Sequence, residues 1–187
     1  MAAKHAGVKV DAFEWVTTDF SQRDNVIVRG DVDGATYFHD SAVSLFQRIR
    51  LKELRLLSFA GTGLAVYGYA VLAATKLINE NPKAAAAVVR ATNRGVMETI
   101  ANLIAAMAYV KQREPMVDEK DVAERWNRGH VLGADTREHG VGDVRKAFVE
   151  QQVAEVSETF GLKSKPDASA IYNLSFLPLK AERMVKA

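Results

Sequence analysis

The sequence predicts an α/β fold whose C-terminal half is rich in helix. Strand and helix signals alternate over roughly the first 70 residues, as in a parallel sheet that is covered by helices. From Thr75 onward, helix caps and residues of high helix propensity follow one another almost without interruption. The chain has 187 residues and no cysteine, so its fold depends on a noncovalent core.

Four segments in the first part of the chain are predicted to be strands. The first carries Phe13 and Trp15 on one face, because side chains alternate along a strand. The last two are separated by the turn Gly61-Thr62-Gly63. In order, the predicted strands are residues 12–17, residues 35–38, "ELRLLSF" at 53–59 and "VYGYAVLAA" at 66–74.

Two helices are predicted between these strands. Ser21 and Asp24 have the S-x-x-D spacing of a helix start, and Gly30 stands where a C-terminal glycine ends a helix. The run Val26-Ile27-Val28 fits a strand equally well, so this segment has two readings. The second helix buries one face, formed by residues at the i, i+3, i+4 and i+7 positions: Ala42, Leu45, Phe46 and Ile49.

The C-terminal half is predicted to hold a series of longer helices. Asn81 caps the first, Pro82 occupies its first position, and "KAAAAVVRATNRGVMETI" continues it. Asn102 caps a second helix, "LIAAMAYVKQ", and Asp118 begins a third. A last long helix runs from about Gly142 to Phe160 and ends at Gly161.

The segment Tyr37 to Ser41 is the strongest candidate for a ligand contact. It follows a predicted strand and precedes a predicted helix, and ligands of open α/β sheets bind outside the carboxyl ends of the strands. Asp40 or Ser41 would cap the helix, whose N-terminus favours an anionic or polar group. A purely structural cap and a ligand role are both consistent with this pattern.

Charge and hydropathy exclude several partners. The 25 Lys and Arg are balanced by 23 Asp and Glu, and they form no basic stripe, so we expect no nucleic-acid partner. The most apolar windows are shorter than the ~20 residues that span a bilayer. The opening "MAAKHAGVKVD" has no apolar signal-peptide core. We therefore expect either a cytosolic chain or one whose true beginning is missing.

Two sharper motifs do not support catalysis or metal binding. His39, Asp40 and Ser41 have the residue types of a hydrolase triad, but consecutive side chains in a turn diverge and cannot form the required relay. We expect no catalytic residue and no cofactor. The second motif is a group of four His, Asp and Glu residues that could be metal ligands. It lacks the H-E-x-x-H spacing of a metal site, so we expect it to lie in a solvated loop. It comprises His130, Asp135, Glu138 and His139.

Several long stretches, taken in order, resemble a known family. They are "GDVDGATYFHDSAVSLFQ", "LRLLSFAGTGLAVYGYAVLAATKLINENPKAAAAVVRATNRGVMETIAN", "YVKQREPMVDEKDVAERW" and the closing "FLP". The chain resembles the substrate-binding proteins of ABC transporters, in the branch that handles thiamine-pyrimidine precursors, nitrate, sulfonates and taurine. The resemblance covers nearly the whole chain, and residues 54–102 are its most specific part.

The resemblance implies part of a two-lobed type II periplasmic-binding fold. Residues 1–68 would form most of the second α/β lobe. Residues 69–187 would supply the returning crossover strand and the C-terminal helices of the first lobe. Because family members begin with a signal peptide and a first-lobe sheet, we expect this chain to be truncated at its N-terminus. It would then self-associate through the apolar surface that the missing lobe leaves exposed.

The resemblance also implies a function and a set of ligand contacts. The function is capture of a small polar or heteroaromatic solute in the periplasm and its presentation to an ABC transporter permease. A rival is a small-molecule enzyme of the pyrimidine-precursor synthase type, which shares the fold. The glycines also fit simple turns, and Tyr67 also fits packing in a hinge. The implied ligand contacts are His39, Asp40, Ser41, Thr62, Gly63 and Tyr67.

Overall fold

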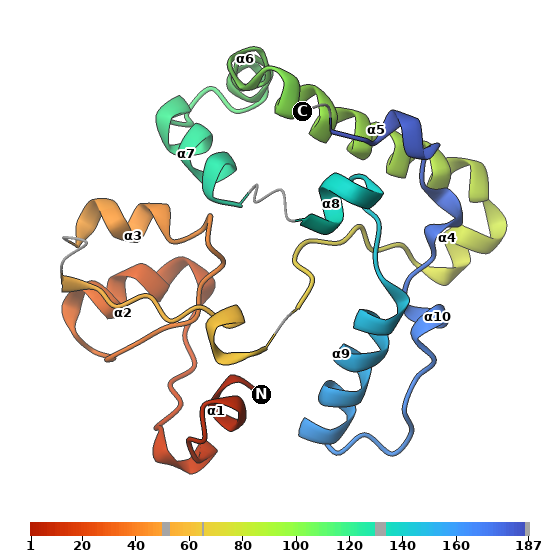
Figure 1. Ribbon diagram of the computed structural model, residues 1–187. Helices are drawn as coiled ribbons and strands as arrows, with labels where there is room; N and C mark the ends of the chain where they lie inside the picture. Colours follow the sequence, from red (N-terminus) through yellow and green to blue (C-terminus); the bar gives the residue numbers. More distant parts are fainter. Residues whose placement is uncertain (50–52, 65, 130–133, 186–187) are drawn as a thin grey trace. The chain divides into compact units, whose positions relative to one another are not determined.

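The computed structural model describes residues 1–49, 53–64, 66–129 and 134–185. Helices dominate these residues (Figure 1), and the chain divides into two compact units. Unit 1 contains residues 1–2, 63–103 and 132–187, whereas unit 2 contains residues 3–62 and 104–131. Each unit is therefore assembled from separate stretches of the chain. The predicted lobe boundary between residues 68 and 69 stays a prediction.

Short helices build most of unit 2. Its first part contains α1 (Ala2–His5), the 3-10 turns η1 (Val10–Ala12) and η2 (Phe20–Gln22), α2 (Arg23–Arg29), α3 (Val43–Arg48) and η4 (Ala60–Thr62). Its second part contains α6 (Leu103–Arg113) and α7 (Glu119–Gly129). The helix α3 packs against both α2 and α7, so it lies at the centre of the unit.

The packing of α3 follows the apolar pattern in the sequence. Ala42, Val43 and Leu45 are buried, with Val43 only 1% exposed. On the polar side, the Gln47 amide donates a hydrogen bond to the Asp121 carboxylate of α7. Of the predicted face, Ala42 and Leu45 are buried and Phe46 and Ile49 are half-buried, so the prediction is confirmed in part. The hydrogen bond between Gln47 and Asp121 joins residues 74 positions apart.

Unit 1 is built around longer helices. In chain order they are α4 (Thr75–Glu80), α5 (Pro82–Ala101), α8 (Ala134–His139), α9 (Lys146–Thr159) and α10 (Ala168–Ile171), followed by the 3-10 turns η5 (Leu174–Phe176) and η6 (Lys180–Glu182). Figure 1 shows α4 leading directly into α5. The helix α10 packs on α9, and η5 packs on α5, so the C-terminal segment covers two of the helices.

Several predicted helix ends are confirmed by their hydrogen bonds. The Asn81 side chain accepts from the Ala84 amide at 3.1 Å, with Pro82 at the first position of α5. The Asp118 carboxylate accepts from the amides of the first turn of α7. Gly30 and Gly161 follow α2 and α9 with φ of 74° and 58°, a left-handed conformation that favours glycine. Because Gly30 ends a helix, the strand reading of residues 26–28 is wrong.

The core of unit 1 lies where α9 meets α10. Val149 and Val153 of α9 and Ala168 of α10 are buried together. Tyr67, Val144 and Tyr172 pack against this cluster and are themselves half-buried. The cluster is small, which leaves many apolar side chains elsewhere exposed.

A buried arginine fastens the C-terminal segment of unit 1. Arg183 is only 8% exposed, and its Nη2 lies 3.0 Å from Asp143 Oδ2. Its Nη1 donates to the carbonyl of His139 at 2.9 Å and its Nε donates to that of Pro178 at 3.2 Å. Gly140 approaches so closely, with φ 94°, that a Cβ there would lie 3.0 Å from the Arg183 carbonyl oxygen. The C-terminal segment and the loop after α8 are thus held together.

The predicted strands are not formed in the part of the chain that the structure describes. Residues 35–38, 54–58 and 66–74 are irregular, and η1 takes the beginning of the segment predicted as the first strand. The physical reason is that a strand is stable only when a neighbouring strand takes its backbone hydrogen bonds. The apolar and β-branched pattern is present, but the pairing is absent. The helix-rich character is confirmed, whereas the α/β class is not.

Candidate functional site

The six predicted ligand residues are divided between the two units. Unit 2 holds four of them, and unit 1 holds the other two. Those in unit 2 are His39, Asp40 and Ser41, in the turn before α3, and Thr62, at the end of η4; those in unit 1 are Gly63 and Tyr67. One of the six, Ser41, accepts a hydrogen bond from a charged side chain.

That charged side chain is Arg23, which begins α2. Its guanidinium carbon lies 3.8 Å from the centre of the Tyr37 ring and 4.5 Å from the centre of the Phe20 ring. Cations bind the faces of aromatic rings at such distances because the ring quadrupole is negative there. Two rings from different segments therefore hold one guanidinium.

Hydrogen bonds fix the same guanidinium on its edge. Nη1 donates to the Thr36 carbonyl at 3.1 Å, and Nη2 donates to Ser41 Oγ at 3.3 Å. Nε is buried, and among the described residues no acceptor lies within hydrogen-bond distance of it. A buried donor without an acceptor costs roughly 1–3 kcal/mol. Arg23 thus keeps one donor that a ligand oxygen could satisfy.

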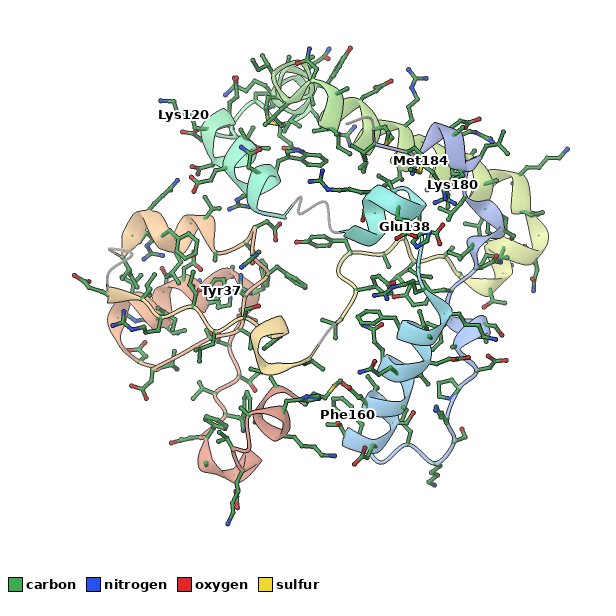
Figure 2. All side chains as sticks on the ribbon, viewed as in Figure 1. Tyr37, Lys120, Glu138, Phe160, Lys180 and Met184 are labelled. Carbon is green, nitrogen blue, oxygen red and sulfur yellow. The ribbon has the colours of Figure 1, made fainter. Side chains whose placement is uncertain are left out.

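The next residue, Asp24, accepts hydrogen bonds from two hydroxyl groups. Its two carboxylate oxygens accept from Tyr37 Oη at 2.7 Å and from Ser44 Oγ at 2.6 Å. Figure 2 labels Tyr37, which lies against α2. The carboxylate therefore joins α2, α3 and the segment before α3 through two short hydrogen bonds.

The environment of Tyr37 keeps its phenol neutral. Burial raises the pKa of Tyr37 to about 12, and the hydrogen bond and negative charge of Asp24 act in the same direction. The positive charge of Arg23 partly offsets these effects. Tyr37 consequently donates to Asp24 as a neutral phenol at physiological pH.

Ser41 does not cap α3, so the prediction that Asp40 or Ser41 caps this helix is wrong. The N-cap position is Ala42, which has no capping side chain. Instead, Ser41 Oγ exchanges hydrogen bonds of 3.1 Å with the amide and carbonyl of Phe38. The serine hydroxyl thus bonds to the backbone of a local turn and not to the first amides of the helix, which is common for serine. With six residues, α3 is also too short to supply a strong helix terminus.

Thr62 and Gly63 form a turn. Thr62 Oγ1 donates to the Phe59 carbonyl at 2.7 Å, which occupies its donor within η4. Gly63 has φ 82°, a conformation that other residues rarely adopt. His39 is exposed, and Asp40 is half-buried. The ligand role of these residues stays a prediction.

Tyr67 is engaged within unit 1. Its ring meets those of Phe148 and Tyr172 edge to face, with centroids 4.7 and 6.3 Å away. Its hydroxyl accepts from the Arg145 amide at 2.9 Å, at the N-terminus of α9. These contacts explain its position without a ligand, and a ligand role for its ring stays a prediction.

The sequence patterns missed Arg23, Asp24 and Tyr37 as members of a site. Arg23 and Asp24 stand in a stretch interpreted as a helix start, and Tyr37 in one interpreted as a strand. One sequence signal could have identified them. Phe20 lies shortly before the adjacent pair Arg23 and Asp24, and all three precede the segment Tyr37–Ser41. Arginine is the cation that most often stacks on aromatic rings.

The candidate metal ligands and the lengths of the helices were also compared with the predictions. His130 lies outside the described residues. Glu138 and His139 belong to α8, which ends at His139, so the solvated loop predicted for these two residues is wrong. Over the described ranges there is no group of three His, Asp or Glu placed to hold a metal ion. None of the helices in the described chain combines the length and the apolar character needed to cross a bilayer.

Comparisons with known proteins identify the family. A search of curated proteins found no match, and a search of solved structures found none either. A family model described as "NMT1/THI5 like" matches residues 1–103, which include Arg23, Asp24, Tyr37 and all six predicted ligand residues. The match covers more than half of the 187 residues. It agrees with the resemblance to proteins that bind thiamine-pyrimidine precursors, nitrate and sulfonates, and the chain belongs to the NMT1/THI5-like family.

Proposed function

We propose that this protein is the solute-binding component of an ABC transporter. Family membership supports this proposal, because the family consists mostly of solute-binding proteins. The proposed solute is small and either polar or heteroaromatic, of the nitrate, sulfonate or pyrimidine-precursor class. The proposed partner is the transporter permease, and the proposed compartment is the periplasm.

The observation that carries the choice of solute is the unused donor of Arg23. Nε is buried without an acceptor, and the Nη2 bond to Ser41 is long at 3.3 Å. A planar guanidinium presents its donors in a fork that matches nitrate, sulfonate and carboxylate oxygens. An oxygen that displaces Ser41 Oγ could accept from both Nε and Nη2. Binding would thereby satisfy a donor that is unsatisfied in the free protein.

The surroundings of Arg23 favour a ligand with both a polar edge and a flat face. Phe20 is 73% exposed although its ring contacts the guanidinium, so the ring retains an accessible surface. The charges of Asp24 and Arg23 both act on Tyr37, so a negative charge lies close to the site and disfavours strongly charged anions relative to weakly basic heterocycles or monoanions. The other predicted contacts, His39, Asp40, Thr62, Gly63 and Tyr67, remain part of the proposal as the family resemblance implies them.

The experiment is isothermal titration of the 187-residue chain with nitrate, an alkyl sulfonate and an aminopyrimidine. The decisive variant is Arg23→Lys, which keeps the charge but removes the Nε donor and the fork. A hydrogen bond to a charged group is worth about 1.5–3 kcal/mol, so affinity should fall at least about tenfold. Arg29→Lys is the matched control, because Arg29 lies on the same helix, is exposed and pairs with Asp31. Its affinity should stay unchanged.

Several results would contradict the proposal. If none of the three solutes binds, these 187 residues do not form the proposed binding site on their own. If Arg23→Lys and Arg29→Lys bind equally well while both remain folded by circular dichroism, the solute does not use Arg23. If a pyrimidine precursor is chemically converted during incubation, the rival enzyme of the synthase type is the better description.

A further inference from the structure

Asp33 and Gly34 form an exposed Asp-Gly step in the loop between α2 and α3 (Figure 1). Both residues are exposed, and neither belongs to a helix or to a hydrogen-bonded turn. No other aspartate in the sequence, and no asparagine, is followed by glycine. A dipeptide that occurs once in the chain therefore lies at a position open to water.

The two polar groups of this step have no partners among the described residues. The Asp33 carboxylate makes no ion pair or hydrogen bond there, and the Gly34 amide donates to no acceptor. Asp31, two positions earlier, differs because its carboxylate accepts from Arg29 Nε at 2.8 Å and from Arg29 Nη2 at 2.6 Å. No contact in the described chain therefore holds the Asp33 carboxyl group away from the amide that follows it.

Glycine also leaves the approach to that amide open. Because Gly34 has no Cβ, no side chain shields its nitrogen from the carboxyl carbon of Asp33. A Cβ built at Gly34 would have no heavy atom within 4 Å apart from its neighbours in the chain. Surface loops are also more mobile than the helices that they connect. The side chain of Asp33 and the amide of Gly34 can therefore reach the geometry in which a ring closes.

We propose that the Asp33-Gly34 step is a site of spontaneous isomerisation of aspartate to isoaspartate. The Gly34 nitrogen attacks Cγ of the protonated Asp33 carboxyl group, a C–N bond forms, and the carboxyl hydroxyl leaves with the amide proton as water. The product is a succinimide ring. Water then adds to one of the two ring carbonyls: addition at Cγ restores aspartate, and addition at the backbone carbonyl carbon gives isoaspartate. Water is the co-reactant, and no group is oxidised or reduced.

The isomerisation changes the backbone that leads to the candidate site. In isoaspartate the chain runs through the former side chain, which inserts an additional carbon atom between the Cα atoms of Asp33 and Gly34. The Thr36 carbonyl accepts from Arg23 Nη1 at 3.1 Å, and the Tyr37 ring centre lies 3.8 Å from the guanidinium carbon of Arg23. We expect the longer backbone to weaken these contacts. Because they lie within the protein, this inference does not depend on the proposed receptor function.

The test is peptide mapping of the 187-residue chain after prolonged incubation in neutral buffer. Trypsin releases residues 30–48 as one peptide, which contains Asp31, Asp33 and Asp40. An endoprotease that cuts before aspartate but not before isoaspartate then identifies the modified position. We expect isoaspartate at residue 33 and none at residue 31. Absence of isoaspartate at residue 33, or a higher yield at residue 40 than at residue 33, would overturn the proposal.

Gly34→Val is the decisive variant. Gly34 has no positive φ and the space around it is open, so the folded chain accommodates valine there. The branched side chain shields the amide, and the yield of isoaspartate at residue 33 should fall severalfold. Ala35→Val is the matched control, because it adds the same side chain at the next exposed position and leaves the Gly34 amide accessible. Equal yields for the two variants would refute attack by this amide.

Unfolding the protein separates the effect of structure from that of sequence. Asp40 is half-buried in the turn before α3, whereas Asp33 is exposed. Incubation in urea should therefore raise the yield of isoaspartate at Asp40 by a larger factor than at Asp33. An equal or larger increase at Asp33 would show that the folded loop protects this step, contrary to the proposal.

The effect on the candidate site is measured on the isomerised protein itself. Isomerised and fresh protein, separated by ion-exchange chromatography, are compared by urea unfolding. The isomerised form should lose part of the free energy of unfolding, because the contacts of Thr36 and Tyr37 with Arg23 are weakened. Identical unfolding curves would show that the additional backbone atom is absorbed within the loop, and would refute the effect on Arg23.

Discussion

Arg183→Ala tests whether the buried arginine holds the C-terminal segment of unit 1 in place. The substitution removes a guanidinium whose three nitrogens all donate within the unit. Two acceptors are the carbonyls of His139 and Pro178, and the third is the Asp143 carboxylate at 3.0 Å. The perturbation therefore leaves one charge and two backbone oxygens without their donor.

The expected cost follows from the burial of these groups. Removing one partner of a fully buried ion pair costs about 3–5 kcal/mol. The side chain of Arg183 is 10% exposed, but that of Asp143 is 28% exposed, so water compensates part of the loss. We therefore expect the free energy of unfolding to fall by about 3 kcal/mol. For a protein of marginal stability, this is a large share of the total.

The assay is urea unfolding followed by circular dichroism, with Arg94→Ala as the matched control. Arg94 forms a shorter contact, 2.6 Å to Glu98, but its side chain is 77% exposed. Exposed pairs of this kind contribute about 0.3–0.5 kcal/mol. If burial decides the energy, Arg183→Ala is several times more costly than Arg94→Ala. Equal losses, or a loss below 1 kcal/mol for Arg183→Ala, would refute the reasoning.

Three further predictions concern a titrating group, a helix cap and a glycine. Folding raises the pKa of Tyr37 from 10 to about 12, so the folded protein binds the phenol proton more tightly than the unfolded chain does. The stability that this group contributes is therefore present below pH 10 and is lost between pH 10 and 12. Urea unfolding at pH 9 and 11.5 should show wild type losing about 1–2 kcal/mol more than Tyr37→Phe, after allowance for solvent screening; parallel losses would contradict this. Asn81→Ala should lower the free energy of unfolding by about 1 kcal/mol, and Asn81→Asp by much less, because aspartate can also accept from the Ala84 amide. Coinciding unfolding curves for the two variants would show that the side-chain cap does not stabilise the protein. Gly140→Ala should lower the thermal unfolding midpoint more than Gly161→Ala. Both glycines have a positive φ, but only a Cβ at Gly140 would also contact Arg183. The reverse order would contradict the close contact between Gly140 and Arg183.

Local signals in the sequence predicted the helix ends of this protein well. Gly30, Asn81 and Gly161 act through their own backbone or through an amide three residues away, so their neighbours in sequence are sufficient to predict them. The strands at residues 35–38 and 66–74 were predicted from the same kind of local pattern. A strand, however, also requires a partner that sequence periodicity does not specify, and none pairs with these segments in the described chain.

The candidate site was only partly predictable for a related reason. The segment Tyr37–Ser41 was recognised as a place where polar groups gather, and Ser41 does contact a charge there. The charge itself comes from Arg23, and the hydrogen bond between Tyr37 and Asp24 joins residues 13 positions apart. No periodic pattern encodes a stacking contact between a helix start and an irregular segment. The capping prediction for Ser41 failed because the Phe38 backbone offered its hydroxyl a nearer partner.

The discontinuous make-up of the two units has a consequence for synthesis on the ribosome. Unit 2 has all its residues once position 131 has been made, whereas unit 1 still needs Arg183 to fasten its loop. At translation rates of about 5–20 residues per second, this gap lasts roughly 3–10 s. During that time the uncharged stretch from Leu56 to Thr75 belongs in part to an unfinished unit.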